Sequence, residues 1–176
     1  MSQKDDKNRY ALSVGHIALE WNLLEHDFQR IGGRYLAIDP EITMHIFAFM
    51  GNVSKRDFVQ FLIERFEKNE TARDYLLHFV NVFHRVRANR NIVEHGLPAI
   101  TEGGAYLDKI IKISQRGDTM PYAASQTELD EFLKDLRSTR AFAKDIETAL
   151  DKNGDFTGIQ KIKMPRRFQT LPNQPD

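Results

Sequence analysis

Apolar residues recur at alternating steps of three and four in three long segments of the chain. The first segment carries eight of them: Tyr10, Val14, Ile17, Trp21, Leu24, Phe28, Ile31 and Tyr35. Similar spacing is found from Thr71 to Gly96 and from Ser125 to Asn153. Positions spaced in this way share one face of an α-helix, so the pattern predicts three long amphipathic helices.

Two shorter helices are predicted between the first two long ones. Asp39, Pro40 and Glu41 form the pattern of an N-cap, a proline at the first helical position and a first-turn acid. The second short helix is predicted to begin near Ser54. Because none of these helices can bury its apolar face alone, we expect them to pack together as a bundle.

The connection between the last two long helices has a different pattern. Residues 98–101 and the β-branched run 106–114 predict a hairpin that turns at Gly103 and Gly104, with a third strand near residues 120–123. The predicted fold class is therefore all-α. It is an up-and-down bundle of four to five helices with a small β-hairpin excursion between the last two long helices.

The composition changes after Asn153 and Gly154. From residue 156 to residue 175 there is no acid, and four bases are present: Lys161, Lys163, Arg166 and Arg167. The pattern predicts a helical domain over 1–153 and a basic, flexible C-terminal tail over 154–176 that adds little to folding. Contact of this tail with RNA is the alternative.

Composition and charge narrow the classes of function. The 25 Lys and Arg residues balance the 25 Asp and Glu residues, which excludes a basic footprint over the whole chain. The absence of cysteine excludes disulfides, thiolate metal sites and a cysteine nucleophile. The longest apolar run, Ile46 to Met50, is far shorter than the ~20 residues that span a bilayer. We expect no membrane contact and, since the first ten residues are polar, a cytoplasmic location.

Arg90 interrupts the apolar face of the second long helix. A buried, unpaired guanidinium is costly, so Arg90 is expected to reach an acid, a pocket or a partner. A polar row lies beside this face: Arg87, Asn91 and His95. His95 falls in the last turn, where it also complements the helix dipole, so purely structural roles for Arg90 and His95 are the alternatives to functional ones.

The hexapeptide from Arg90 to His95, RNIVEH, resembles the arginine–x4–histidine signature of the HEPN superfamily (higher eukaryote and prokaryote nucleotide-binding domains). The resemblance covers roughly residues 10–150. It implies that Arg90, Asn91 and His95 are the catalytic residues, with no cofactor. It also implies a homodimer whose two motifs face each other across a cleft. Members modified by partner nucleotidyltransferases usually carry Tyr two residues after the His, and this chain departs from them with Leu97.

The residue types suit RNA cleavage by the substrate's own 2′-hydroxyl. Histidine exchanges protons near neutral pH, and arginine presents a planar fork to phosphate oxygens. Positions five apart diverge by about 140° on an ideal helix, so Arg90 and His95 of one chain are not expected to converge. The spacing is consistent with a symmetric dimer that brings the Arg90 and His95 of two chains into one composite site. His16 and Glu20 share a helix face, but no further ligand completes a metal site, so no metal is predicted.

The sequence thus predicts an HEPN-like, RNA-directed protein, a metal-independent endoribonuclease of defence or toxin type. Its expected partners are a second copy of the chain, RNA or a nucleotide, and a protein antitoxin. The alternative is a non-catalytic HEPN-like interaction or nucleotide-binding module, and a third interpretation is a helical interaction protein that carries the motif by chance. Local charge discriminates between the first two: Arg85, Arg87 and Arg90 surround the motif against the single acid Glu94.

Overall fold

The computed structural model describes residues 3–101, 106–114 and 116–172. Its elements in chain order are α1 (Gln3–Gly33), α2 (Pro40–Ala48), α3 (Asn52–Phe66), α4 (Glu70–His95), β1 (Leu97–Ile100), β2 (Tyr106–Ile113), β3 (Thr119–Ala123) and α5 (Gln126–Asp151). A helical bundle with a small sheet between α4 and α5 confirms the predicted fold class. The predicted turn at Gly103 and Gly104 lies outside the described residues.

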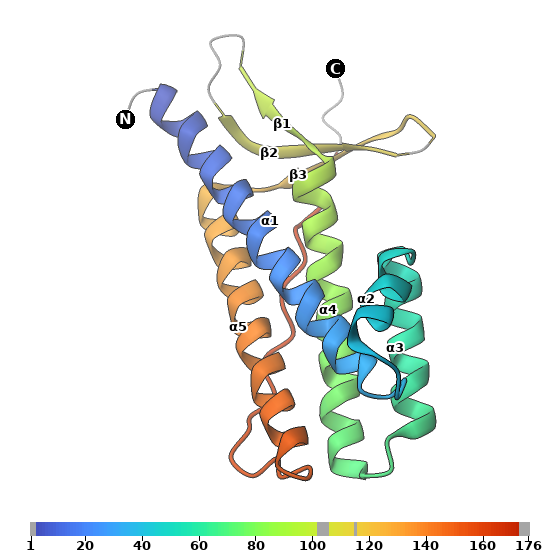
Figure 1. Cartoon of the computed structure of the whole chain (residues 1–176). Helices are drawn as coiled ribbons and strands as arrows, with labels where there is room; N and C mark the ends of the chain where they lie inside the picture. Colours follow the sequence, from blue (N-terminus) through green and yellow to red (C-terminus); the bar gives the residue numbers. More distant parts are fainter. Residues whose placement is uncertain (1–2, 102–105, 115, 173–176) are drawn as a thin grey trace.

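The helices pack around one long axis, with the sheet across one end (Figure 1). α1 runs diagonally over the bundle and packs against α5 and α4, while α2 and α3 lie on the far side of α4 from α5. The sheet is antiparallel in the order β1-β2-β3, and β2 contacts both α1 and α4. The sheet therefore covers the end of the bundle at which α4 finishes.

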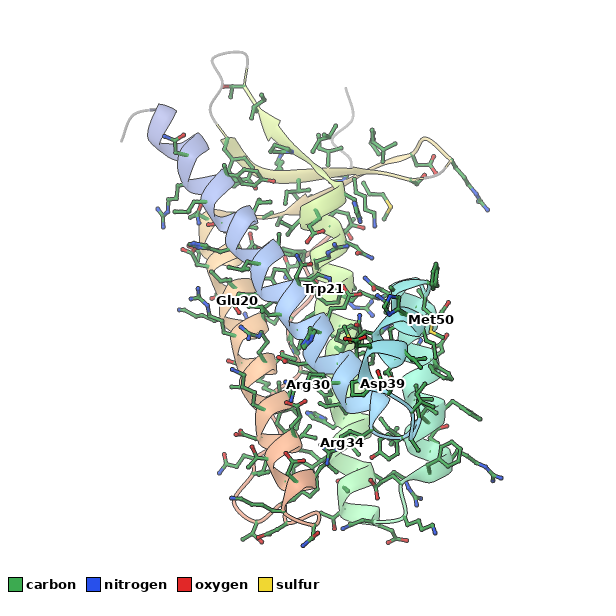
Figure 2. The ribbon with its side chains drawn as sticks, in the orientation of Figure 1. Glu20, Trp21, Arg30, Arg34, Asp39 and Met50 are labelled. Carbon is green, nitrogen blue, oxygen red and sulfur yellow. The ribbon has the colours of Figure 1, made fainter. Side chains whose placement is uncertain are left out.

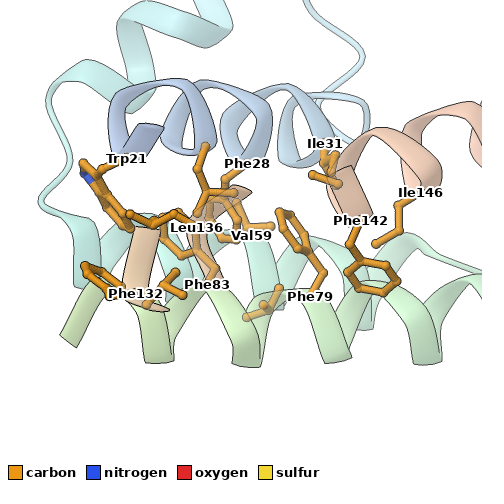
Figure 3. Packing of buried hydrophobic residues seen from close by; sticks show 14 of the residues in the cluster. Trp21, Phe28, Ile31, Val59, Phe79, Phe83, Phe132, Leu136, Phe142 and Ile146 are labelled. Atoms are coloured by element: carbon orange, nitrogen blue, oxygen red, sulfur yellow. The ribbon is translucent and has the colours of Figure 1, made fainter. Parts of the chain in front are cut away.

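One apolar core runs through the bundle, and aromatic rings fill its centre (Figure 3). The predicted apolar face of α1 is confirmed, since its central residues from Ile17 to Ile31 are fully buried. Phe83 of α4 stacks on Phe28 with ring centroids 3.8 Å apart and on Trp21 at 5.0 Å. These contacts fix α1 against the middle of α4, which is the helix that carries the motif.

The helix starts follow local capping chemistry. The side chain of Asp39 accepts a hydrogen bond from the backbone N–H of Glu41 (2.7 Å), as predicted. Ser125 and Glu128 form a complete capping box at α5. For α4 the cap is Asn69, whose Oδ1 accepts from the N–H of Ala72 (3.1 Å), so α4 begins before the predicted Thr71. α3 likewise begins at Asn52, ahead of the predicted Ser54.

The C-terminal segment differs from its prediction as a flexible tail. After α5, Asn153 and Gly154 adopt positive φ, and the chain turns back along the bundle behind α4 and α5 toward the sheet (Figure 1). Phe156 is 6% exposed and Phe168 is 9% exposed, and both belong to the core. The boundary after residue 153 is therefore corrected: residues 154–172 are part of the folded domain. Residues 173–176, the end of the predicted tail, lie outside the described residues.

Polar contacts hold the same segment in register. Asn89, only 2% exposed, donates from Nδ2 to the carbonyl oxygen of Arg166 (2.6 Å) and accepts at Oδ1 from the N–H of Phe168 (3.3 Å). The Tyr75 hydroxyl donates to the carbonyl oxygen of Ile159 (2.7 Å). Further along, Thr170 forms a β-bridge with Tyr122 of β3. The few apolar residues of this segment can dock on α4 because Asn89 and Tyr75 make hydrogen bonds with its backbone.

Candidate functional site

The predicted site occupies the last turns of α4, where that helix reaches the sheet. Arg90 lies beside α1, with its Cζ 5.5 Å from the centre of the Trp21 ring. Trp21 is fully buried, and Figure 2 shows it in the part of α1 that crosses α4. A guanidinium over an indole face is a favourable cation–π arrangement, which explains how an arginine fits into an otherwise apolar seam.

The guanidinium of Arg90 contacts three polar side chains of the motif: Asn91, Glu94 and His95. It forms an ion pair with Glu94 one turn further along α4, which is one of the alternatives expected from the sequence. Its Nη1 donates to Oδ1 of Asn91 (3.2 Å) and lies 3.4 Å from Nε2 of His95. All three predicted site residues therefore lie together in a single chain.

This convergence corrects the expectation that Arg90 and His95 of one chain do not converge. The backbone directions of the two residues still diverge, as five helical positions require. The long arginine side chain spans that angle, however, because its guanidinium is several bonds from the helix. One chain consequently holds a cation and an imidazole within 3.4 Å of each other.

The site residues differ in their exposure to solvent. The side chain of Arg90 is 17% exposed, and its Nε is buried with no hydrogen-bond partner. Asn91 is half-buried, whereas His95 is exposed. The imidazole is thus accessible to a large substrate, while the guanidinium is held in place by Trp21 and Glu94.

Gly96 allows β2 to approach the end of α4 directly beside the site. A Cβ at this position would overlap Cγ2 of Ile110 and lie 2.5 Å from the carbonyl oxygen of Ile92. The second contact is with backbone, so no side-chain rotation can relieve it.

We expect Gly96→Ala to lower the free energy of unfolding by about 1–3 kcal/mol, measured by urea denaturation. Unchanged stability would show that the strand can move away at no cost.

A second polar group lies toward the middle of α4 and was missed by sequence reasoning. The charges of four guanidinium groups act on His84, and we call these groups the arginine band: Arg56 of α3, Arg85 and Arg87 of α4, and Arg167 of the C-terminal segment. Nη2 of Arg87 lies 3.5 Å from Nδ1 of His84. Burial lowers the pKa of His84 below its usual 6.5, and the arginine band lowers it further. His84 is therefore neutral at pH 7.

Two surface pockets lie away from the motif. One of about 500 Å³ lies between α5 and the C-terminal segment, and another of about 460 Å³ lies between the end of α1 and α2. The lining of neither pocket includes the three predicted site residues. Neither of these two pockets is therefore part of the predicted site.

The face of α1 that carries His16 and Glu20 has a different role. Glu20 accepts from Nη1 of Arg140 (2.6 Å) and from Nε of Arg137 (3.0 Å), so its carboxylate ties α1 to α5. Burial alone would raise the pKa of Glu20, but the hydrogen bonds and charges of Arg140 and Arg137 together outweigh it and lower this pKa. Among the residues that the structure describes, no group of three or more His, Asp or Glu side chains could hold a metal ion.

Comparisons with known families, curated proteins and solved structures give no significant match to the chain. The interpretation of the site therefore depends on its own residues and geometry. No helix within residues 3–101, 106–114 and 116–172 combines the length and apolar character needed to cross a membrane.

Proposed function

We propose that this chain is an HEPN-like, metal-independent endoribonuclease of defence or toxin type, with His95 and Arg90 as its catalytic residues. The observation that carries the proposal is the 3.4 Å approach of the Arg90 guanidinium to the His95 imidazole at an exposed helix end. Asn91 orients the guanidinium through its hydrogen bond to Nη1. The nearby arginine band supplies positive charge that a neutral chain otherwise lacks.

In the proposed reaction the substrate provides its own nucleophile. His95 takes the proton of the RNA 2′-hydroxyl as the oxygen attacks the adjacent phosphorus. Arg90 stabilises the added negative charge of the phosphorane. The P–O5′ bond then breaks, and the imidazolium returns a proton to the departing 5′-oxygen. The products are a 2′,3′-cyclic phosphate and a 5′-hydroxyl, and no step requires a metal.

The second candidate function is a non-catalytic RNA- or nucleotide-binding module. The ion pair between Arg90 and Glu94 favours a non-catalytic motif, because it gives the guanidinium a structural role within α4. Incubation of the chain with single-stranded RNA in EDTA separates the two functions. The nuclease predicts cleavage products, whereas binding without cleavage, unchanged by His95→Ala, would leave only the module.

A homodimer is part of the proposed function. Three leucines on the outer face of α1 are between 40% and 59% exposed, at spacings of seven and four residues: Leu12, Leu19 and Leu23. Such a stripe on a helix favours association with a second apolar surface. We expect a dimer by sedimentation at tens of micromolar. A strictly monomeric chain would contradict the composite dimer site, while the in-chain pair of Arg90 and His95 would remain.

A further inference from the structure

The arginine band holds more positive charge than its neighbours neutralise. Asp57 forms an ion pair with Arg56 (Nε to Oδ1, 3.0 Å) and is also the acid that faces Arg87. Within the described part of the chain, Arg85, Arg87 and Arg167 form no ion pair. Burial and the Arg56 guanidinium lower the pKa of Arg87. Like charges are thus held close together, and a bound anion would relieve their repulsion.

An unpaired donor adds to this charge. The Nε atom of Arg87 is buried and lacks a hydrogen-bond partner, whereas the Nε of Arg56 is the atom that faces Asp57. Buried donors of this kind are costly to leave unpaired. An arginine fork suits phosphate oxygens, which accept hydrogen bonds from two of its nitrogens at once. Neutral His84 between the guanidinium groups can add a hydrogen bond without adding charge.

The arginine band and the motif lie along one face of α4. His84 and His95 are separated by eleven helical positions, which rotate by only about 20° and rise by about 16 Å. That distance corresponds to about five nucleotides at 3.4 Å per stacked base. A single strand can therefore contact both places at once.

We propose that the arginine band binds the phosphate backbone of single-stranded RNA and directs it along α4 to His95. The proposal deepens the proposed function and depends on it for the choice of RNA. Phe49, in the short connection before α3, is 90% exposed and offers a ring on which a base can stack. The C-terminal segment takes part through Arg167, whose charge acts on His84 and whose neighbours Arg166 and Phe168 are held on α4 by Asn89.

The test measures binding of a fluorescent single-stranded RNA of about ten nucleotides, within the usual site size. His95→Ala is the background, so that no cleavage intervenes. Arg56→Gln, Arg87→Gln and Arg167→Gln should each weaken binding about five-fold at 0.1 M salt and reduce the slope of log affinity against log salt by about 0.7. A trinucleotide, too short to span both places, should bind more weakly than the longer strand.

Arg65→Gln is the matched control, since Arg65 is an exposed arginine in the last turn of α3. The proposal is overturned if Arg56, Arg87 and Arg167 variants bind as the control does. Assignment to RNA is overturned if inorganic polyphosphate competes equally well and Phe49→Ser leaves RNA affinity unchanged. If the chain binds RNA through the arginine band but never cleaves it, the proposed nuclease function is contradicted and the RNA-binding role of the band is not. Melting temperatures check that each variant is folded.

Discussion

Replacing His95 by Ala is expected to slow RNA cleavage by a factor of about 10² to 10⁴, the usual contribution of one general acid–base group. The His95 side chain is exposed and does not pack in the core, so its loss should leave the melting temperature nearly unchanged. A gel assay on labelled RNA with matched protein concentrations measures the effect. His95→Ala chains that cleave at the wild-type rate would remove the imidazole from the mechanism.

Arg90 variants separate charge from packing in the same assay. Arg90→Ala removes the cation–π contact with Trp21 and the ion pair with Glu94, so it should reduce both activity and stability. Arg90→Lys keeps the charge but loses the planar fork, so it should recover stability more than activity. If the activity of Arg90→Lys recovers to the same extent as its stability, the role of Arg90 is structural only.

Removing residues 154–176 is expected to destabilise the chain by at least about 5 kcal/mol, because two buried phenylalanines leave the core together. For a chain of this length the melting temperature should fall by more than about 10 °C. Phe168 also packs edge-to-face on Phe132 of α5, with centroids 5.6 Å apart. Thermal denaturation followed by circular dichroism measures the change.

Single substitutions within the segment serve as controls for the truncation. Phe168→Ala should cost about 3–5 kcal/mol, whereas Lys163→Ala, at an exposed position of the same segment, should cost almost nothing. If the truncated chain melts within a few degrees of the full chain, the docked segment contributes nothing to folding. The prediction that this segment adds little to folding would then hold.

The helical part of the fold could be predicted because each helix is determined by residues close together in the sequence. The apolar spacing of α1 and the capping residues Asp39 and Ser125 each determine their structure within a few positions. Docking of the C-terminal segment is different in kind. It depends on Asn89, which lies 77 residues from its backbone partner Arg166, and no local pattern marks that pairing.

The same contrast applies to the site. Arg90, Asn91 and His95 could be selected from a short motif, and the arginine in an apolar seam correctly indicated an unusual environment. The position of Trp21 beneath the guanidinium was not predictable, because it follows from the crossing of α1 and α4. Arg56 and Arg167 come to α4 from other elements, so the arginine band exists only in the folded chain.

The chemical ends of the RNA products test the central claim most directly. RNA is incubated with the chain in EDTA, and the fragments are analysed by mass spectrometry, with His95→Ala as the parallel sample. The account predicts 2′,3′-cyclic phosphate and 5′-hydroxyl ends from the wild-type chain and intact RNA from the variant. Fragments with 3′-hydroxyl and 5′-phosphate ends, or cleavage that EDTA abolishes, would contradict it.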